Sequence, residues 1–159
     1  TSKTCYSICC ISWHDIIYGI NTMEILRDIK FNDFGDIEIS NKDIKLIHNK
    51  TEIIRQNAVD RIRSAKYDYP LYNSFGADLA SLIGRKTSNT LEDIAVSNIT
   101  NSLTEDGFLD GNSVEVIALI KNQSMVIKVS IATLLSGFTS TQINITATIN
   151  MISGIINVY

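Results

Sequence analysis

Three cysteines and one histidine near the start of the chain are the side chains best suited to bind a soft metal ion. If this segment were helical, Cys5 and Cys9 would lie one turn apart, and so would Cys10 and His14. Structural zinc sites, however, usually pair ligands about two to four residues apart in two separate half-sites. We therefore interpret the cysteines as small apolar side chains and expect neither a metal ion nor a cofactor. Their odd number and tight clustering also favour a reducing compartment without disulfides.

Two carboxylates in a later loop are the residues best suited to acid–base catalysis. Glu105 and Asp110 share a glycine-containing loop, and two carboxylates at the right separation can hydrolyse a glycosidic bond. Turn formation around Gly107 and Gly111 explains the same residues equally well. The sequence contains no nucleophile elbow, phosphate-binding loop or HExxH motif. We therefore expect a protein that is not an enzyme, with a peptidoglycan hydrolase as the alternative.

Four further carboxylates crowd one expected hairpin: Asp33, Asp36, Glu38 and Asp43. Their spacing does not match a calcium-binding EF-hand loop. We interpret them as a solvated acidic hairpin.

The composition favours a protein whose surface is shared with partners. The chain has 159 residues, 45% of them hydrophobic, which suits one domain with a sizeable core. A net charge of −3 disfavours nucleic-acid binding, and no apolar run is long enough for a membrane helix. Only 19% of the residues are charged, against about a quarter in typical proteins. We therefore expect protein partners, and neither nucleic acid nor a membrane.

The N-terminal half shows a strand pattern followed by a helix pattern. Apolar and polar residues alternate over residues 28–47, which predicts three short, half-buried strands. Apolar side chains at four-residue spacing predict a helix over residues 52–65, with Thr51 as its cap. Arg61 is expected to lie mostly on the side of this helix that faces away from the core.

Two more helices are predicted in the middle of the chain. The first is short, covers residues 77–83 and ends at Gly84. The second covers residues 90–103, and Asn89 with Glu92 resembles a capping box at its start.

The last third of the chain has the pattern of a sheet. Residues 114–120 and 125–135 are apolar on both faces and flank a hairpin-sized turn, so we expect both strands to lie centrally. Residues 142–151 alternate between apolar and polar, and one face of this strand carries Ile143, Ile145 and Ile149. The whole pattern predicts an α+β fold, with a small mixed or antiparallel sheet packed against about three helices.

The segment between the first two helices has the shape of a connector. It contains the single proline of the chain, Pro70, between Tyr69 and Tyr72, and it then reaches Phe75 before a glycine. Aromatic clusters of this kind usually wedge helices together or anchor an interface.

The order of these elements resembles a family of contractile-tail baseplate proteins. The acidic hairpin, the helix with Gln56 and Arg61, the Tyr-Pro connector and the apolar hairpin are similar, over residues 24–133, to the wedge protein often called the sheath initiator. The similar members are those of phages of Gram-positive bacteria and related phage-tail-like particles. The family usually carries a Glu-Pro-Arg motif after its third helix, and here only Glu105 matches it.

The resemblance implies a fold similar to the innermost domain of tail sheath proteins. It also implies a virion tail baseplate, or a tail-like bacteriocin, assembled in the host bacterial cytoplasm. The implied partners are the tail sheath protein, other baseplate wedge proteins and tail tube or hub proteins, in multiple copies around a six-fold axis. The implied role is to template the first sheath ring and to relay the contraction trigger.

On this basis we divide the chain into an apolar arm (1–23), a wedge-like domain (24–135) and a C-terminal β extension (136–159). We expect the extension, and also the arm, to pair with a neighbouring chain by strand addition, although the last strand fits equally well inside the chain's own sheet. A truncation lacking residues 139–159 is then expected to fold. The expected interface residues are Gln56, Arg61, Tyr69, Pro70, Tyr72, Phe75, Glu105, Ile143, Ile145 and Ile149.

Overall fold

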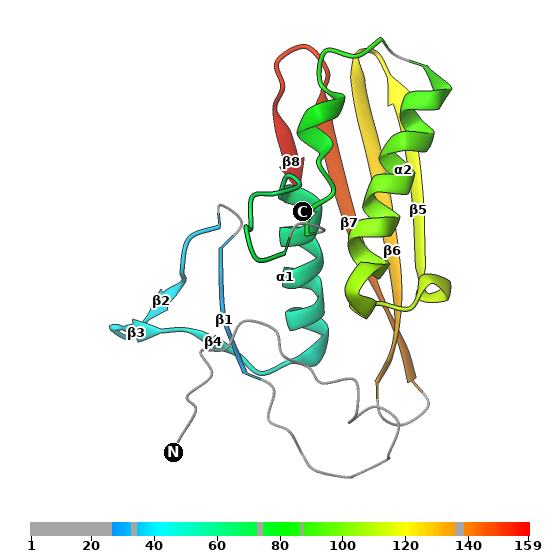
Figure 1. Cartoon of the computed structure of the whole chain (residues 1–159). Coiled ribbons are helices and arrows are strands. Elements are labelled where there is room, and N and C mark those ends of the chain that lie inside the picture. The colour runs from blue at the N-terminus through cyan, green and yellow to red at the C-terminus, as the bar shows by residue number, and fades with distance from the viewer. Residues whose placement is uncertain (1–26, 33–34, 73–74, 87, 136–138) are drawn as a thin grey trace.

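The protein is built from two layers, a four-stranded antiparallel sheet and two α-helices packed on one of its faces (Figure 1). The computed structural model describes residues 27–32, 35–72, 75–86, 88–135 and 139–159. The expected α+β fold is confirmed, with two α-helices in place of about three.

A small N-terminal ribbon, two helices and the main sheet follow one another along the chain. The ribbon contains four two-residue strands, and single 3₁₀ turns separate the larger elements. In chain order the elements are β1 (Asp28–Ile29), β2 (Ile39–Ser40), β3 (Asp43–Ile44), β4 (Leu46–Ile47), α1 (Lys50–Arg63), η1 (Leu79–Leu82), α2 (Asn89–Thr104), η2 (Glu105–Gly107), η3 (Gly111–Ser113), β5 (Val114–Lys121), β6 (Ser124–Leu135), β7 (Thr139–Asn150) and β8 (Ile156–Val158).

Helix α1 begins two residues earlier than expected because its cap is Asn49 and not Thr51. The Asn49 side chain accepts a hydrogen bond from the Thr51 backbone N–H at 3.0 Å. Ala58 and Ile62, four residues apart, are fully buried on the face that packs against the sheet.

The helix expected over residues 77–83 is only a single 3₁₀ turn. Asp78, directly before it, has a left-handed backbone conformation with φ of 51°, which a continuous α-helix does not permit. The helix expected over residues 90–103 is α2. The expected capping box is absent there, because the Glu92 carboxylate accepts a hydrogen bond from the Ile120 N–H of β5 at 2.6 Å.

In the main sheet, strand order follows chain order, β5-β6-β7-β8. The turn between β5 and β6 places Asn122 and Gln123 at positive φ, as tight hairpin turns require. Our expectation that β5 lies centrally is wrong, since it forms one edge of the sheet. Ile117 and Leu119 point to the sheet face that carries no helix and are exposed there.

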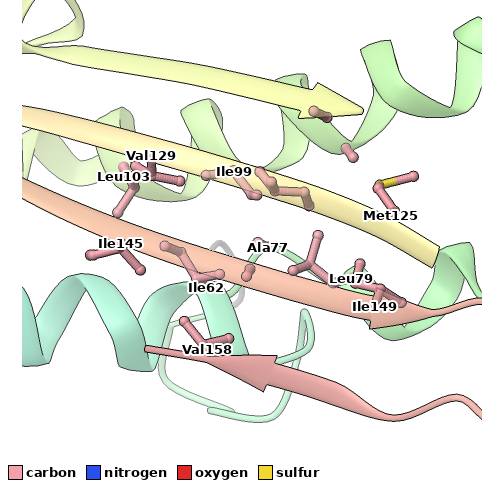
Figure 2. Packing of buried hydrophobic residues seen from close by; sticks show 14 of the residues in the cluster. Ile62, Ala77, Leu79, Ile99, Leu103, Met125, Val129, Ile145, Ile149 and Val158 are labelled. Carbon is pink, nitrogen blue, oxygen red and sulfur yellow. The ribbon is translucent and has the colours of Figure 1, made fainter. Parts of the chain in front are cut away.

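Strand β7 belongs to the centre of the chain's own sheet. It pairs with β6 over twelve residues from Thr139 to Asn150, and with β8 at Ala147–Ile149. Its buried side chains meet those of both helices in one core, part of which is shown in Figure 2. Residues 139–159 are thus part of the main body and not a separate extension, and a truncation that removes them would also remove much of the core. Ten of the core side chains are labelled in Figure 2: Ile62, Ala77, Leu79, Ile99, Leu103, Met125, Val129, Ile145, Ile149 and Val158.

The N-terminal ribbon lies beside α1, on the side away from α2 (Figure 1). β1 pairs with β4 and β2 pairs with β3, all antiparallel. Backbone hydrogen bonds also join the chain around Lys30, Glu38 and Lys45. Lys30 N–H donates to Lys45 O, Glu38 N–H donates to Lys30 O, and Lys45 N–H donates to Glu38 O.

Candidate functional site

Arg61 sits at the junction of α1, α2 and the connector, where its side chain is 7% exposed. Its guanidinium carbon lies 4.8 Å from the ring centroid of Phe75 and 4.6 Å from that of Phe108. Its Nη1 donates to the Ser102 carbonyl oxygen at 2.9 Å. The expectation that Arg61 faces away from the core is wrong, because two aromatic faces and a carbonyl replace water around the charge.

The connector begins at the C-terminal end of α1, and its last residues are hydrogen-bonded to that same end. Ala77 N–H donates to Arg61 O at 2.9 Å, and Asp78 N–H donates to Ser64 O at 3.2 Å. Between these contacts Gly76, with φ of 109°, presses against the end of α1. A Cβ atom there would come within 2.6 Å of the Ala65 carbonyl oxygen. The connector is therefore a closed surface loop whose ends are fixed to α1.

The tip of this loop presents aromatic and aliphatic side chains to solvent. Tyr69 and Phe75 form an edge-to-face pair at 4.7 Å, with Phe75 on the inner side. Tyr67 and Leu71 are 72% and 89% exposed, and Pro70 and Tyr72 are exposed as well. We call residues 67–72 the aromatic loop. Of the expected interface aromatics, Tyr69 and Tyr72 are accessible, whereas Phe75 packs on Arg61.

Gln56 joins the N-terminal ribbon to α1. Its side-chain oxygen accepts a hydrogen bond from Phe31 N–H at 2.9 Å, and its side-chain nitrogen donates to Ile29 O at 2.9 Å. One amide side chain thus pairs with both the Phe31 N–H and the Ile29 carbonyl, as the backbone of a neighbouring strand would. In this structure Gln56 serves contacts within the chain.

A shallow groove of about 160 Å³ runs between the ribbon, α1 and the end of β8. Burial raises the pKa of Asp60 above its usual 3.8, the negative charge of Asp28 adds to the rise, and the positive charge of Arg63 opposes it. The groove is shallow and holds charges of both signs, so it does not have the shape of an enclosed substrate site. Its lining includes Lys30, Gln56, Asp60, Arg63, Val158 and Tyr159.

The three expected interface isoleucines of β7 face the core. Ile143, Ile145 and Ile149 are at most 4% exposed. Their side chains are therefore not accessible to a neighbouring chain.

Along part of one edge, the backbone of β7 nevertheless has no strand partner among the described residues. Thr146 and Tyr159 exchange both of their backbone hydrogen bonds, at 2.7 and 3.0 Å. Backbone groups alternate in direction along a strand, so Gln142 and Asn144 point their N–H and C=O groups to the same side as Thr146. β8 pairs with β7 at residues 147–149, with further backbone bonds at Thr146 and Asn150, so within the described residues this edge has no strand partner before Thr146.

The carboxylates considered for catalysis lie on the surface. Glu105 is exposed at the end of α2, and Asp110 caps the 3₁₀ turn η3 by accepting from Asn112 N–H at 3.2 Å. Neither lines the groove beside α1. Of the four carboxylates in the expected acidic hairpin, Glu38 is ion-paired with two lysines. Asp33 lies outside the described residues.

The cysteines and His14 lie outside the described residues. Within the described part of the chain, no three His, Cys, Asp or Glu side chains are grouped so that they could hold a metal ion. Of the helices described, none combines the length and the apolar character that crossing a bilayer would require.

Sequence reasoning missed the most exposed aliphatic side chains of the ribbon. The alternating pattern over residues 28–47 predicts half-buried strands, but Ile37, Ile39, Ile44 and Leu46 are 43–71% exposed. The alternation correctly separated the two faces of the ribbon. It could not indicate which face would be turned towards α1.

Comparison of the chain with protein-family models, with curated proteins and with solved structures found no match in any of the three.

Proposed function

We propose that this protein is a structural component of a contractile-tail baseplate that templates the first ring of the sheath. The proposal starts from the resemblance of residues 24–133 to the sheath-initiator family. In this role the chain lies at the junction of baseplate and tube, binds the tail sheath protein and other wedge proteins, and relays the contraction trigger. It acts through assembly and not through catalysis.

The observation that carries the proposal is the open edge of β7. A strand edge with free N–H and C=O groups can accept a strand from another chain, and main-chain hydrogen bonds then supply the affinity. Gln142 and Asn144 are exposed, so an incoming strand can reach this edge. The site of strand addition is therefore the first half of β7, since its second half is already paired with β8.

The aromatic loop supplies a second contact of the kind that assembly proteins use. Exposed tyrosines supported from behind by packed side chains are common anchors of protein interfaces. Here Phe75 and Arg61 support Tyr69, and the close approach of Gly76 fixes the base of the loop. The loop is therefore preorganised, which reduces the entropy lost on binding.

A proline at the open edge tests the proposal. In Gln142→Pro, the N–H that an incoming strand would bond is removed, whereas the β6 ladder uses the neighbouring residues and is retained. The measurement is the polymerisation of purified sheath protein in the presence of the chain, followed by light scattering and electron microscopy. We expect the variant to fold and to lose nucleation of sheath tubes.

Gln142→Ala is the matched control, because it removes the same side chain and keeps the backbone donor. It should nucleate sheath as the original chain does. Equal nucleation by the alanine and proline variants would refute strand addition at this edge. Absence of nucleation by the original chain itself would refute the baseplate role.

A further inference from the structure

The N-terminal ribbon turns aliphatic side chains towards solvent and charged side chains towards α1. Ile39 and Ile44 lie directly opposite each other in the β2–β3 pair, so their side chains share a face. Ile37 lies two residues before Ile39 and bridges Phe31, and Leu46 lies two residues after Ile44 and pairs with Ile29 of β1. Because side chains alternate along extended chain, Ile37 and Leu46 lie on the same face as Ile39 and Ile44. These four exposed side chains, Ile37, Ile39, Ile44 and Leu46, form what we call the aliphatic quartet.

The opposite face of the ribbon is charged, and it is the face held against α1. Lys45 Nζ lies 2.6 Å from a Glu38 carboxylate oxygen, and Lys30 Nζ lies 3.6 Å from Glu38 and 3.1 Å from Glu52 of α1. Gln56 adds its two hydrogen bonds to the β1 backbone. Polar contacts therefore fix the ribbon in an orientation that leaves its aliphatic face in water. Exposed apolar side chains grouped on one face are a feature of many interaction surfaces.

We propose that the aliphatic quartet is the docking surface for the chain's own N-terminal segment, residues 1–26. This inference is independent of the proposed baseplate role. The structure does not describe these residues, but their chemistry suits the surface. The segment is rich in isoleucine, cysteine and aromatic residues, and its lysine, histidine, aspartate and glutamate side chains number only four: Lys3, His14, Asp15 and Glu24.

The position of the segment in the chain favours it over a second copy of the protein. Residue 26 is followed directly by Arg27 and then by β1, which belongs to the ribbon itself. Such a tether gives an effective concentration on the order of millimolar, so a small contact is enough to hold the segment.

The size of the surface leads to the same choice. Four partly exposed side chains offer on the order of a few hundred Å², whereas a stable interface between separate chains buries about 800 Å² on each partner. A second copy bound through the quartet alone would therefore dissociate at ordinary concentrations.

Trp13 provides a direct test, since it is the single tryptophan of the chain and lies in this segment. The experiment compares the fluorescence of the full chain with that of the double variant Ile39→Lys, Ile44→Lys. We expect Trp13 to emit at short wavelength in the original chain. In the variant the emission should shift to longer wavelength and acrylamide quenching should increase severalfold.

A double variant outside the ribbon controls for added charge. Leu71→Lys with Ile152→Lys replaces two aliphatic side chains that are also exposed, at 89% and 71%. The emission of this variant should match that of the original chain. Emission that is unchanged by the ribbon substitutions, or that shifts equally in both double variants, would overturn the proposal.

Cross-linking distinguishes the chain's own segment from a second copy and leaves the quartet intact. All three native cysteines lie in residues 1–26, so a fourth cysteine introduced by Ser40→Cys can be linked to them with a bismaleimide. We expect peptide mapping of the monomeric band to find position 40 linked to the segment, in a yield that does not depend on protein concentration. Ser97→Cys on α2 is the control and should give much less. A product of dimer mass, or equal monomer linking from both positions, would refute the proposal.

Discussion

Arg61 and Ser102 are joined by two reciprocal hydrogen bonds across the helix layer. The Arg61 Nη1 donates to the Ser102 carbonyl oxygen at 2.9 Å, and the Ser102 hydroxyl donates to the Arg61 carbonyl oxygen at 3.4 Å. Both residues are buried, at 7% and 2% exposed. Because each lies near the C-terminal end of its helix, the pair fixes the end of α1 against the end of α2. The connector and its aromatic loop begin at this fixed point.

Removal of the Arg61 guanidinium should destabilise the fold. Arg61→Met keeps an unbranched apolar side chain but leaves the buried Ser102 carbonyl without its donor and ends both aromatic contacts. We expect a loss of about 2 to 4 kcal/mol in the free energy of unfolding, measured by urea denaturation. Arg55→Met, at an exposed position of the same helix, should change it by less than about 0.5 kcal/mol. An Arg61→Met protein as stable as the original chain would show that the Arg61 contacts do not stabilise the fold.

Two glycines at positive φ should respond differently to alanine. In Gly76→Ala the new Cβ meets the carbonyl oxygens of Ala65 and Ser64 at 2.6 and 2.7 Å, so we expect a loss of more than about 3 kcal/mol. Gly84→Ala, with φ of 78° and no atom within 4 Å of the new Cβ, should cost only about 1 to 2 kcal/mol. Thermal unfolding of the two variants checks the difference. Equal melting temperatures would show that the loop can move away from α1.

Truncation of a β7 isoleucine should act on stability and not only on assembly. Ile145 is 1% exposed in the core, and Ile145→Ala should cost about 2 to 5 kcal/mol. Ile117→Ala, at a 49% exposed position of β5, should cost less than about 1 kcal/mol. Urea denaturation of the purified chains measures both. If Ile145→Ala leaves the midpoint unchanged, β7 does not belong to the chain's own core in solution.

Asp60 should make the fold less stable as the pH rises. Burial raises its folded-state pKa above the usual 3.8, so between those two values the folded state holds more protons than the unfolded state. Stability associated with this group is therefore present below pH 3.8 and is lost as the pH rises through the folded-state pKa. Asp60→Asn should be more stable than the original chain at neutral pH, and the difference should shrink towards pH 3.8.

Urea midpoints at a series of pH values measure this effect. Glu38 has the opposite sign, because its hydrogen bond to Lys45 lowers its pKa and its contribution is lost on acidification. The comparison must therefore be made between Asp60→Asn and the original chain at each pH, so that the Glu38 contribution cancels. A stability difference that grows on acidification would contradict the assignment to Asp60.

The sequence by itself determined the two α-helices, the long strands and the buried face of β7. Periodicity located α1, α2, β5, β6 and β7 to within a few residues, because apolar side chains at a period of 3.6 or 2 can be buried only in one type of element. It also assigned Ile143, Ile145 and Ile149 to a single face. These properties are local, so a single chain carries enough information to predict them.

Tertiary structure decided which faces and edges are covered. β5 lies at an edge although both of its faces are apolar, and β7 lies inside although its pattern also suits an exposed strand, because strand order depends on pairing between distant segments. Arg61 is buried because Phe75 and Phe108, far apart in the sequence, both pack against its guanidinium. The ribbon turns its aliphatic face outwards because Glu52 and Gln56 of α1 bind its polar side and backbone. The strand order, the burial of Arg61 and the orientation of the ribbon all depend on contacts between segments far apart in the sequence. A local sequence pattern carries no information about such contacts.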